Sequence, residues 1–589
     1  MHMRSFELQI CNVGGRVAPR SRLANPKEAG GFEAAWYQSR RMSTGNAELQ
    51  KQIQRRKTFA IISHPDAGKT TLTEKLLLYG GAIQLAGAVK AKKGRASAVS
   101  DWMEMERERG ISITSSVLQF PYRGLSMNLL DTPGHADFSE DTYRTLHAAD
   151  GAVMILDCAK GVEAQTLKLF RVCKQRKMPI FTFVNKMDRP GREPFDLVGE
   201  VEHVLGIGVY PVTWPIYRGA TFRGVYHRIA RTVHLFDEAK AGSSAASGAE
   251  MAVAMTVTGL ADPKLKDELD EQGYKQLREE AELLDSAGDS FDLAKFEAGD
   301  VSPMVFGSAI NNFGLEAFLE SFCKLMPAPR PRISSKGPIA PDDDQFSAFV
   351  FKIQANMNRA HRDRVAFLRV CSGKFERGMK VRHVRTGKEI RLANPMQMMA
   401  QERNIVEEGY AGDVLGVHDP GLFEIGDTLT GGKDFAYEEI PSFAPEHFVR
   451  AFLAEPMRRK QLKAGLDQLA QEGTIQLYRP PEGRSGDPVL GAVGRLQLDV
   501  VKFRLENEYD VDVRLEPMSI EFARWVSRED GGEVDLLAFD RERVGTPVVD
   551  VKGRPVVLFG GDWQLNSAKR TFSGIVYEET AHGGAVRSE

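Results

Sequence analysis

The sequence predicts an α/β chain that opens with a doubly wound, mostly parallel sheet and continues with a β-barrel domain and an α+β domain. Three observations support this prediction. Apolar runs alternate with helical segments in the first half, short strands with recurring turn glycines follow, and strands and helices mix near the end. A length of 589 residues exceeds what one core usually supports, so several domains are expected.

Composition narrows the class of protein. The chain is 42% hydrophobic and 27% charged with a formal net charge of -2, so any nucleic-acid contact must come from local basic faces. No apolar run approaches the roughly 18 residues that span a bilayer, so we expect no membrane association. Cysteines without C-x-x-C pairing predict reduced thiols and a cytoplasmic protein. The five are Cys11, Cys158, Cys173, Cys323 and Cys371.

The amino-terminal stretch, residues 1–50, is expected to be a poorly structured extension. It contains several arginines but lacks the apolar segment of a secretory signal, and it shows little helical or strand periodicity. A simple explanation is that Met42 is the natural start. Intact-mass measurement of the protein from its native host tests that hypothesis.

A nucleotide-binding domain is predicted over residues 51–330, because buried strands there alternate with helices. The expected strands are Phe59–Ile62, Asn128–Leu130, Ala152–Leu156, Ile180–Val184 and Met304–Phe306. Leu72, Leu76 and Tyr79 share one face of a helix, and another helix is expected over 165–175. Residues 213–300 are interpreted as an insertion, with a loop at 242–248 and an amphipathic helix at 262–286.

The remaining chain divides into three parts. Prolines around 327–331 and the following loop indicate a linker at 331–344. Short strands with turn glycines predict a β-barrel at 345–435. Residues 440–589 are expected to form an α+β domain with a carboxyl-terminal tail, and helices are predicted at 456–472 and 496–509 with a strand at 474–478. The tail after Pro517 carries the weakest pattern.

A phosphate-binding loop follows the first strand and opens a helix. Its residues are Ser63, His64, Pro65, Asp66, Ala67, Gly68, Lys69 and Thr70. In this P-loop context, backbone N–H groups and the helix dipole attract phosphate oxygens, and Lys69 adds a charge for the β and γ phosphates. The Thr70 hydroxyl can ligate Mg²⁺. The first position is Ser rather than the usual Gly or Ala, and a chance Gly-Lys-Thr is the alternative.

Three further segments follow predicted strands and identify the nucleotide. The first contains Asp131, Thr132, Pro133, Gly134 and His135; the second contains Asn185, Lys186, Met187 and Asp188; the third contains Gly307, Ser308 and Ala309. Asp131 can hold Mg²⁺ through water, although Asp-Thr-Pro-Gly also suits an ordinary turn. Asp188 can accept two hydrogen bonds from guanine, and adenine offers neither donor. Strand ends of doubly wound sheets bind ligands, so we predict a GTP/GDP site.

These segments, together with Arg109–Thr114, resemble the translational GTPases, in which histidine follows Asp-Thr-Pro-Gly. Segments 100–106, 351–357, 361–367 and 491–497 resemble bacterial release factor 3, a family related to elongation factor G. The resemblance extends from about Lys57 to Leu515. It implies a P-loop G domain followed by a β-barrel and a third domain. Gly412 and Gly426 lie in motifs similar to the second domain of elongation factors.

The resemblance also implies residue roles. Ser112 matches the Mg²⁺-ligating position of switch I, with Thr114 as the alternative ligand, beside Thr70 and Asp131. His135 matches the residue that positions the attacking water, and Asp66 matches an acidic loop residue that organises charge; with Lys69 they form the expected catalytic set. The structural alternatives are a helix-start cap for His135 and a turn carboxylate for Asp66.

The implied activity is ribosome-stimulated GTP hydrolysis that releases class-I peptide chain release factors from terminated ribosomes. The expected partners are the ribosome, through rRNA and ribosomal proteins, and a class-I release factor, and the chain is expected to be a monomer. Three alternatives stay open: a translocase like elongation factor G, a GTP-dependent binding module without relevant hydrolysis, and a P-loop ATPase. The translocase would need two further domains, and about 73 residues follow Glu516.

Overall fold

The computed structural model describes residues 47–83, 105–106, 112–237, 253–287, 290–355, 364–393, 395–399, 402–440 and 444–579. The amino-terminal extension predicted over 1–50 therefore lies outside the described residues up to position 46. Its last part is helical, because α2 covers Ala47–Gln54. Leu49 and Ile53 of α2 are buried beside Ala411, so this end of the predicted extension is ordered by packing.

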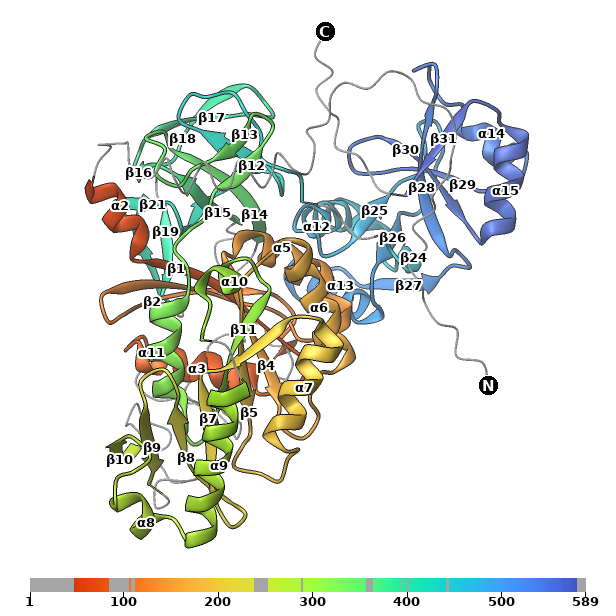
Figure 1. The fold of residues 1–589 in the computed structure, drawn as a ribbon. Coiled ribbons are helices and arrows are strands. Elements are labelled where there is room, and N and C mark those ends of the chain that lie inside the picture. The colour runs from red at the N-terminus through yellow and green to blue at the C-terminus, as the bar shows by residue number, and fades with distance from the viewer. Residues whose placement is uncertain are drawn as a thin grey trace, which may run out of the picture. The chain divides into compact units, whose positions relative to one another are not determined.

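A seven-stranded sheet forms the centre of the first domain, in the order β2-β3-β1-β4-β5-β11-β6 (Figure 1). The strands are β1 Arg56–Ser63, β2 Ser116–Tyr122, β3 Leu125–Asp131, β4 Gly151–Asp157, β5 Ile180–Asn185, β6 Gly208–Pro211 and β11 Val301–Phe306. Only β2 runs antiparallel to its neighbour. The predicted strands are confirmed, because each apolar run that was recognised lies inside one of these strands.

Helices cover both faces of this sheet, which confirms the doubly wound class. They are α3 Lys69–Tyr79, α5 Ser139–Ala148, α6 Ala164–Gln175, α7 Pro194–Leu205 and α11 Leu315–Leu325, with the short 3-10 helix η1 at Ala136–Phe138. Ile61 and Phe181 pack in one core with Leu72 of α3. Ile62 packs in the other core with Leu169 of α6. Alternate residues of each central strand thus pack into the two cores on opposite faces of the sheet.

The predicted insertion contains a four-stranded antiparallel sheet in the order β10-β9-β8-β7. Its elements are β7 Thr213–Arg218, β8 Thr221–His227, β9 Thr232–Phe236, β10 Val253–Thr258, α8 Lys264–Glu268, α9 Glu271–Ala287 and α10 Leu293–Glu297. The helix expected at 262–286 is present as α8 and α9, which are separated where Asp270 Oδ1 accepts from the Gly273 amide. The loop predicted at 242–248 lies outside the described residues.

The segment predicted as a linker is not only a loop. It contains a hairpin of β12 Arg332–Ser334 and β13 Gly337–Ile339, which is closed by the Ser334 hydroxyl donating to the Gly337 carbonyl. Two strands of three residues each are too short to show an alternating pattern, which explains why the hairpin left no clear sequence signal.

The second domain is a curled antiparallel sheet of eight strands, in the order β18-β17-β23-β14-β15-β22-β19-β20, with β16 and β21 as a separate pair. The strands are β14 Ser347–Ala355, β15 Arg364–Ser372, β16 Lys374–Glu376, β17 Lys380–His383, β18 Lys388–Arg391, β19 Met396–Met399, β20 Glu402–Ile405, β21 Glu408–Tyr410, β22 Val414–His418 and β23 Thr428–Thr430. The predicted all-β domain is confirmed in this half-barrel form.

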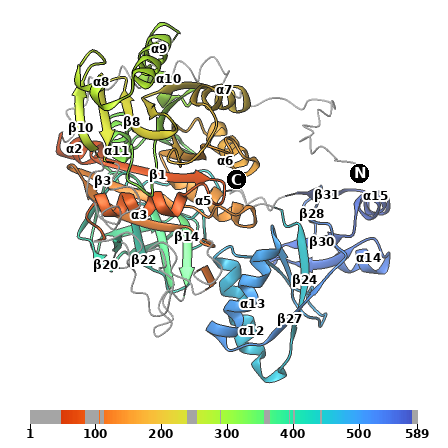
Figure 2. The ribbon, with the colours of Figure 1, turned by 90° about the horizontal axis from the view of Figure 1, so that it is seen from below.

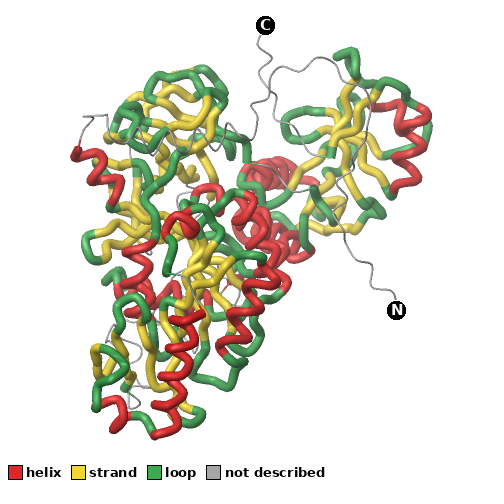
Figure 3. The backbone as a smooth tube through the Cα atoms, in the orientation of Figure 1, coloured by secondary structure: helices red, strands yellow, loops and turns green. Residues whose placement is uncertain are grey.

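Two α+β units follow, each with a four-stranded sheet (Figures 1 and 3). The first has β24 His447–Leu453, η4 Pro456–Arg458, α12 Arg459–Gln471, β25 Gln476–Tyr478, β26 Val489–Ala492, α13 Arg495–Tyr509 and β27 Val513–Pro517. The second has β28 Phe522–Arg528, α14 Leu536–Arg541, β29 Thr546–Val549, β30 Pro555–Phe559, α15 Asp562–Thr571 and β31 Ile575–Glu578. Both predicted helices and the predicted strand belong to the first unit. The stretch called a tail forms the second unit.

Within the first α+β unit, α12 and α13 lie side by side and share a core through Leu466 and Leu505 (Figure 2).

Among the described residues, no helix combines the length and the hydropathy that crossing a membrane requires.

Candidate nucleotide site

The loop between β1 and α3 has the backbone of an anion-binding nest. Asp66 and Gly68 adopt left-handed conformations with φ of 69° and 99°. An added Cβ at Gly68 would lie 2.2 Å from Asn185 Nδ2, so both the conformation and the space require glycine. Such alternation turns successive N–H groups toward one point at the amino end of α3. The backbone from Ser63 to Thr70 is therefore compatible with the phosphate-binding role predicted for it.

Lys69 and Asp131 meet at the centre of this site. Lys69 Nζ lies 2.7 Å from Asp131 Oδ1, and the two side chains are only 8% and 2% exposed. Asp131 ends β3, which pairs with β1 so that Asp131 stands opposite Ile61. Thr132 Oγ1 donates to the Ile61 carbonyl at 2.6 Å and fixes the following turn. A buried lysine and a buried carboxylate thus neutralise each other directly beside the phosphate loop.

Asn185 connects three of the predicted segments. Its Nδ2 donates to the Ala67 carbonyl at 2.8 Å, and its Oδ1 accepts from the Ala309 amide at 2.9 Å. The Met187 amide donates to the Gly307 carbonyl at 3.1 Å, which adds a second bond to the third segment. The end of β5 is therefore joined both to the phosphate loop and to the turn after β11.

Lys186 lies across the phosphate loop. Its Nζ donates to the Asp66 carbonyl at 2.6 Å and pairs with Asp157 Oδ2 at 2.8 Å. Burial alone would raise the pKa of Asp157, but hydrogen bonds from Lys186 and the Ala159 amide hold that pKa below its usual range. Sequence reasoning missed Asp157. Its signal was available, because Asp157 ends an apolar strand in the same way that Asp131 ends β3.

Asp188 follows Lys186 on the loop after β5. Its side chain is 20% exposed, and its Oδ2 lies 3.9 Å from Arg189 Nε. Ser308 is buried, and its hydroxyl accepts from Asn311 Nδ2 at 3.3 Å. The predicted base-recognition residues therefore lie on two adjacent loops, after β5 and after β11.

The segment that contains Ser112 and Thr114 is fixed by a buried acid. Glu106 Oε1 accepts from the Ile113 amide at 2.9 Å and from the Thr114 amide at 3.1 Å. Glu106 itself is fully buried. Arg109, Gly110 and Ile111 lie outside the described residues. Glu106 was recognised only as part of a motif, and its capping of the 113–114 amides was not predicted.

His135 caps η1. Its Nδ1 accepts from the Asp137 amide at 3.2 Å and lies 3.4 Å from Asp137 Oδ1, while the side chain is 41% exposed. The cap that was weighed as an alternative for His135 is therefore present. It occupies only Nδ1, so it is compatible with a role for the other ring nitrogen in orienting water.

The donor set fits a hard divalent cation. Hydroxyl and carboxylate oxygens are the ligands that Mg²⁺ prefers, and Thr70 and Asp131 provide one of each beside the phosphate loop. Among the described residues, no group of three or more His, Cys, Asp or Glu side chains forms a metal site of its own. A cation here would take its remaining ligands from phosphate oxygens and water, which is the usual arrangement for Mg²⁺.

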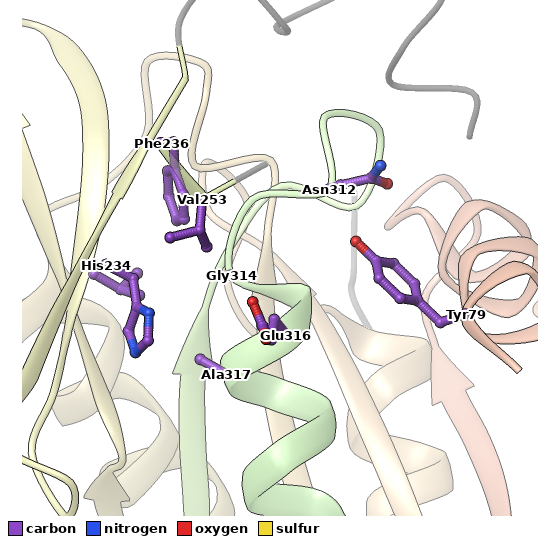
Figure 4. Close-up of a pocket in the computed structure, with 9 residues that line it drawn as sticks. Tyr79, His234, Phe236, Val253, Asn312, Gly314, Glu316 and Ala317 are labelled. Carbon is purple, nitrogen blue, oxygen red and sulfur yellow. The ribbon is translucent and has the colours of Figure 1, made fainter. Parts of the chain in front are cut away.

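A small cavity lies apart from these residues, between the antiparallel sheet of the insertion and the helices α3 and α11 (Figure 4). Tyr79 from the end of α3, His234 from β9 and Glu316 from α11 lie around it. Burial raises the pKa of the Tyr79 hydroxyl and lowers the pKa of His234. The cavity contains none of the predicted site residues.

Three models of known families match successive parts of the chain. Residues 54–328 match the elongation factor Tu GTP binding domain, residues 345–432 match elongation factor G domain 2, and residues 437–569 match the class II release factor RF3, C-terminal domain. The last match includes the first α+β unit and the second unit as far as α15, and so covers most of the stretch that sequence reasoning left as a tail.

Curated relatives match over nearly their whole length. Peptide chain release factor 3 of Symbiobacterium thermophilum is 54% identical over 90% of this chain and 99% of its own. The protein of the same name from Gloeobacter violaceus is 51% identical over 91% of this chain and 99% of its own. A crystal structure of a protein from Thermus thermophilus aligns with a TM-score of 0.61 at 22% identity, over 81% of this chain and 70% of that one. This last likeness concerns the fold.

Proposed function

This chain belongs to the peptide chain release factor 3 family of translational GTPases, and from that membership we propose a ribosome-stimulated GTP hydrolase that removes class-I release factors from terminated ribosomes. GTP binding and hydrolysis and a role in translation termination follow from the family itself. Ribosomal stimulation and the release of the class-I factor are the proposal.

The observation that carries the proposal is the joining of four loops at one edge of the sheet. Asn185 bonds to both Ala67 and Ala309, and Lys69 meets Asp131. These contacts join the loops after β1, β3, β5 and β11, which supports one nucleotide site at this edge of the sheet. Asp188 is assigned to the guanine edge, because its carboxylate can accept from both N1–H and the exocyclic amine.

Hydrolysis in this site requires little covalent help from the protein. Phosphoryl transfer depends on positioning, charge neutralisation and an in-line water. The loop amides and Lys69 hold the phosphates, Asp66 helps to organise the surrounding charge, and His135 orients the water. Mg²⁺, when bound, neutralises phosphate charge, and Thr70, Asp131 and Ser112 would hold it; Thr114 is the alternative to Ser112.

The carboxyl-terminal match favours termination over translocation. The residues after 437 match a release-factor domain rather than the later domains of a translocase. An ATPase is disfavoured by Asp188, which adenine would leave unpaired. A monomer acting directly with the ribosome and a class-I release factor is the simplest assembly for this proposal.

His135→Ala is expected to keep GTP affinity and to lose most of the turnover that ribosomes stimulate. An imidazole that orients water contributes about 10²–10⁴-fold to such steps, and the ring is exposed enough that its removal should not unfold the loop. Phosphate release with and without ribosomes measures the loss, and nucleotide binding serves as the control. Turnover equal to that of the unaltered chain would remove His135 from the mechanism.

A further inference from the structure

Asp137 is shared between the loop that carries His135 and the first turn of α13. Its Oδ1 lies 3.4 Å from His135 Nδ1, and its Oδ2 accepts from the Leu496 amide at 2.7 Å. The two oxygens of one carboxylate therefore contact the first domain's candidate catalytic ring and the third domain's helix. Because Nδ1 accepts from the Asp137 amide, the neutral ring carries its proton on Nε2, which can donate to water, and Asp137 contacts the ring through both its amide and its carboxylate.

The start of α13 is built around this carboxylate. The Leu496 amide is one of the helix-start donors that has no partner inside the helix, and the helix dipole favours a negative charge there. Gln497 Oε1 accepts from the Val493 and Gly494 amides at 2.8 and 3.1 Å and fixes the turn. Asp137, from another domain, supplies the acceptor for the Leu496 amide.

Gly494 leaves the space that Asp137 occupies. Its backbone is extended, with φ of -136°, so any residue could adopt it. An added Cβ, however, would lie 2.1 Å from Asp137 Cγ and 2.5 Å from Asp137 Oδ2. Glycine is therefore required here by the contact between domains and not by the conformation of its own backbone.

An apolar cluster joins the same helix to both candidate switch segments. Met105 and Ile113 come from the segment around Ser112, and Phe138 directly follows Asp137. All three are buried together with Val500 of α13. A change in the position of α13 would therefore alter the packing of both the Ser112 segment and the His135 loop.

We infer that Asp137 is a positioning residue through which α13 sets the orientation of His135, so that the placement of the third domain controls GTP hydrolysis. This inference rests on the proposed role of His135. Separation of α13 from the loop would free the Asp137 carboxylate from the Leu496 amide and change its hold on the ring. Hydrolysis then depends on a residue outside the predicted nucleotide-binding set.

Two substitutions in the full chain test the inference from opposite sides. Asp137→Asn removes the charge, and Gly494→Ala displaces the carboxylate from the α13 side. Both should lower the kcat of ribosome-stimulated hydrolysis about 10- to 100-fold with the KM for GTP unchanged, as expected for a misplaced catalytic group. Matched controls are Asp196→Asn and Gly199→Ala on exposed positions of α7, where an added Cβ at Gly199 meets nothing within 4 Å.

A double-substitution cycle separates positioning from general damage. If Gly494→Ala acts by displacing Asp137, it should cost nothing further in an Asp137→Ala background. Additive losses, or a kcat equal to that of the unaltered chain in both single variants, would overturn the inference. His135→Ala is measured in parallel: its loss of turnover alongside active Asp137 and Gly494 variants would refute the positioning role alone, whereas an active His135→Ala would refute the proposed mechanism itself.

Discussion

At the scale of single residues, buried polar groups at strand ends define the site. Asn185, Asp131 and Asp157 each end a strand of the central sheet, and each contacts either the phosphate loop or a lysine that lies against it. Removing water from such groups is costly unless partners replace it. Their pairings therefore fix the loops before any nucleotide arrives.

His147 makes stability depend on pH. Burial, together with the nearby charges of Arg176 and Arg332, lowers the pKa of His147 to about 3. The folded protein therefore holds His147 neutral, while the unfolded chain takes up a proton below about pH 6.5. Its contribution to stability is fully present above about pH 6.5 and is lost as pH falls toward 3.

Replacement of His147 by Gln should reduce this acid sensitivity. Between about pH 6 and pH 4, the slope of unfolding free energy against pH should fall by up to about 1.4 kcal/mol per pH unit. Urea unfolding across that range measures the slope, and His203→Gln at an exposed position of α7 is the matched control. An unaltered slope in the His147 variant would contradict the assigned cause.

At the scale of elements, the phosphate loop is the least tolerant turn in the first domain. Gly68→Ala meets both a left-handed φ and the Asn185 amide at 2.2 Å. We expect nucleotide binding to be lost and stability to fall by about 1–3 kcal/mol. Nucleotide titration and urea unfolding report the two effects.

Gly124→Ala separates strain from crowding. Gly124 has φ of 79°, yet an added Cβ there meets nothing within 4 Å. This control should show the strain without loss of nucleotide binding. Equal nucleotide affinity in the Gly68→Ala and Gly124→Ala variants would mean that the close contact between Gly68 and Asn185 is not needed for nucleotide binding.

The elements that sequence predicted are those with strong local signals. Ile180–Val184 and Ala152–Leu156 are long apolar runs, and the loop Ser63–Thr70 carries its own spacing, so strand positions and loop chemistry could be inferred together. The sheet of β7 to β10 was missed because its strands are not continuous apolar runs: Pro215 interrupts β7, and Arg223 and Gly224 interrupt β8. The Asp137–Leu496 contact spans 359 positions, and no local pattern encodes such a pairing.

At the scale of the whole molecule, a buried ion pair joins the second domain to the first. Arg369 of β15 pairs with Asp150, the residue directly before β4, and each side chain is 1% exposed. Arg369 also donates to Thr58 Oγ1 at 3.1 Å, while Arg332 lies 3.4 Å from the same aspartate. The joint is therefore a small network that is sheltered from solvent.

Arg369→Met should destabilise the chain by about 3–5 kcal/mol, because it leaves a buried carboxylate with reduced compensation. Urea unfolding measures the loss. The exposed pair Lys324–Glu320 provides the matched control, since Lys324→Met should cost less than about 1 kcal/mol. Similar costs for the two variants would show that burial of the Arg369–Asp150 pair does not matter. Adding Asp150→Asn should recover part of the Arg369→Met loss.

The central claim is that GTP hydrolysis by this chain drives a class-I release factor from the terminated ribosome. The most direct measurement follows a labelled class-I factor on terminated ribosomes after addition of the chain with GTP or with ATP. We expect departure of the factor to accelerate with GTP and not with ATP, and the His135→Ala chain to lose repeated turnover. Departure at the same rate without the chain, or with ATP in place of GTP, would contradict the account.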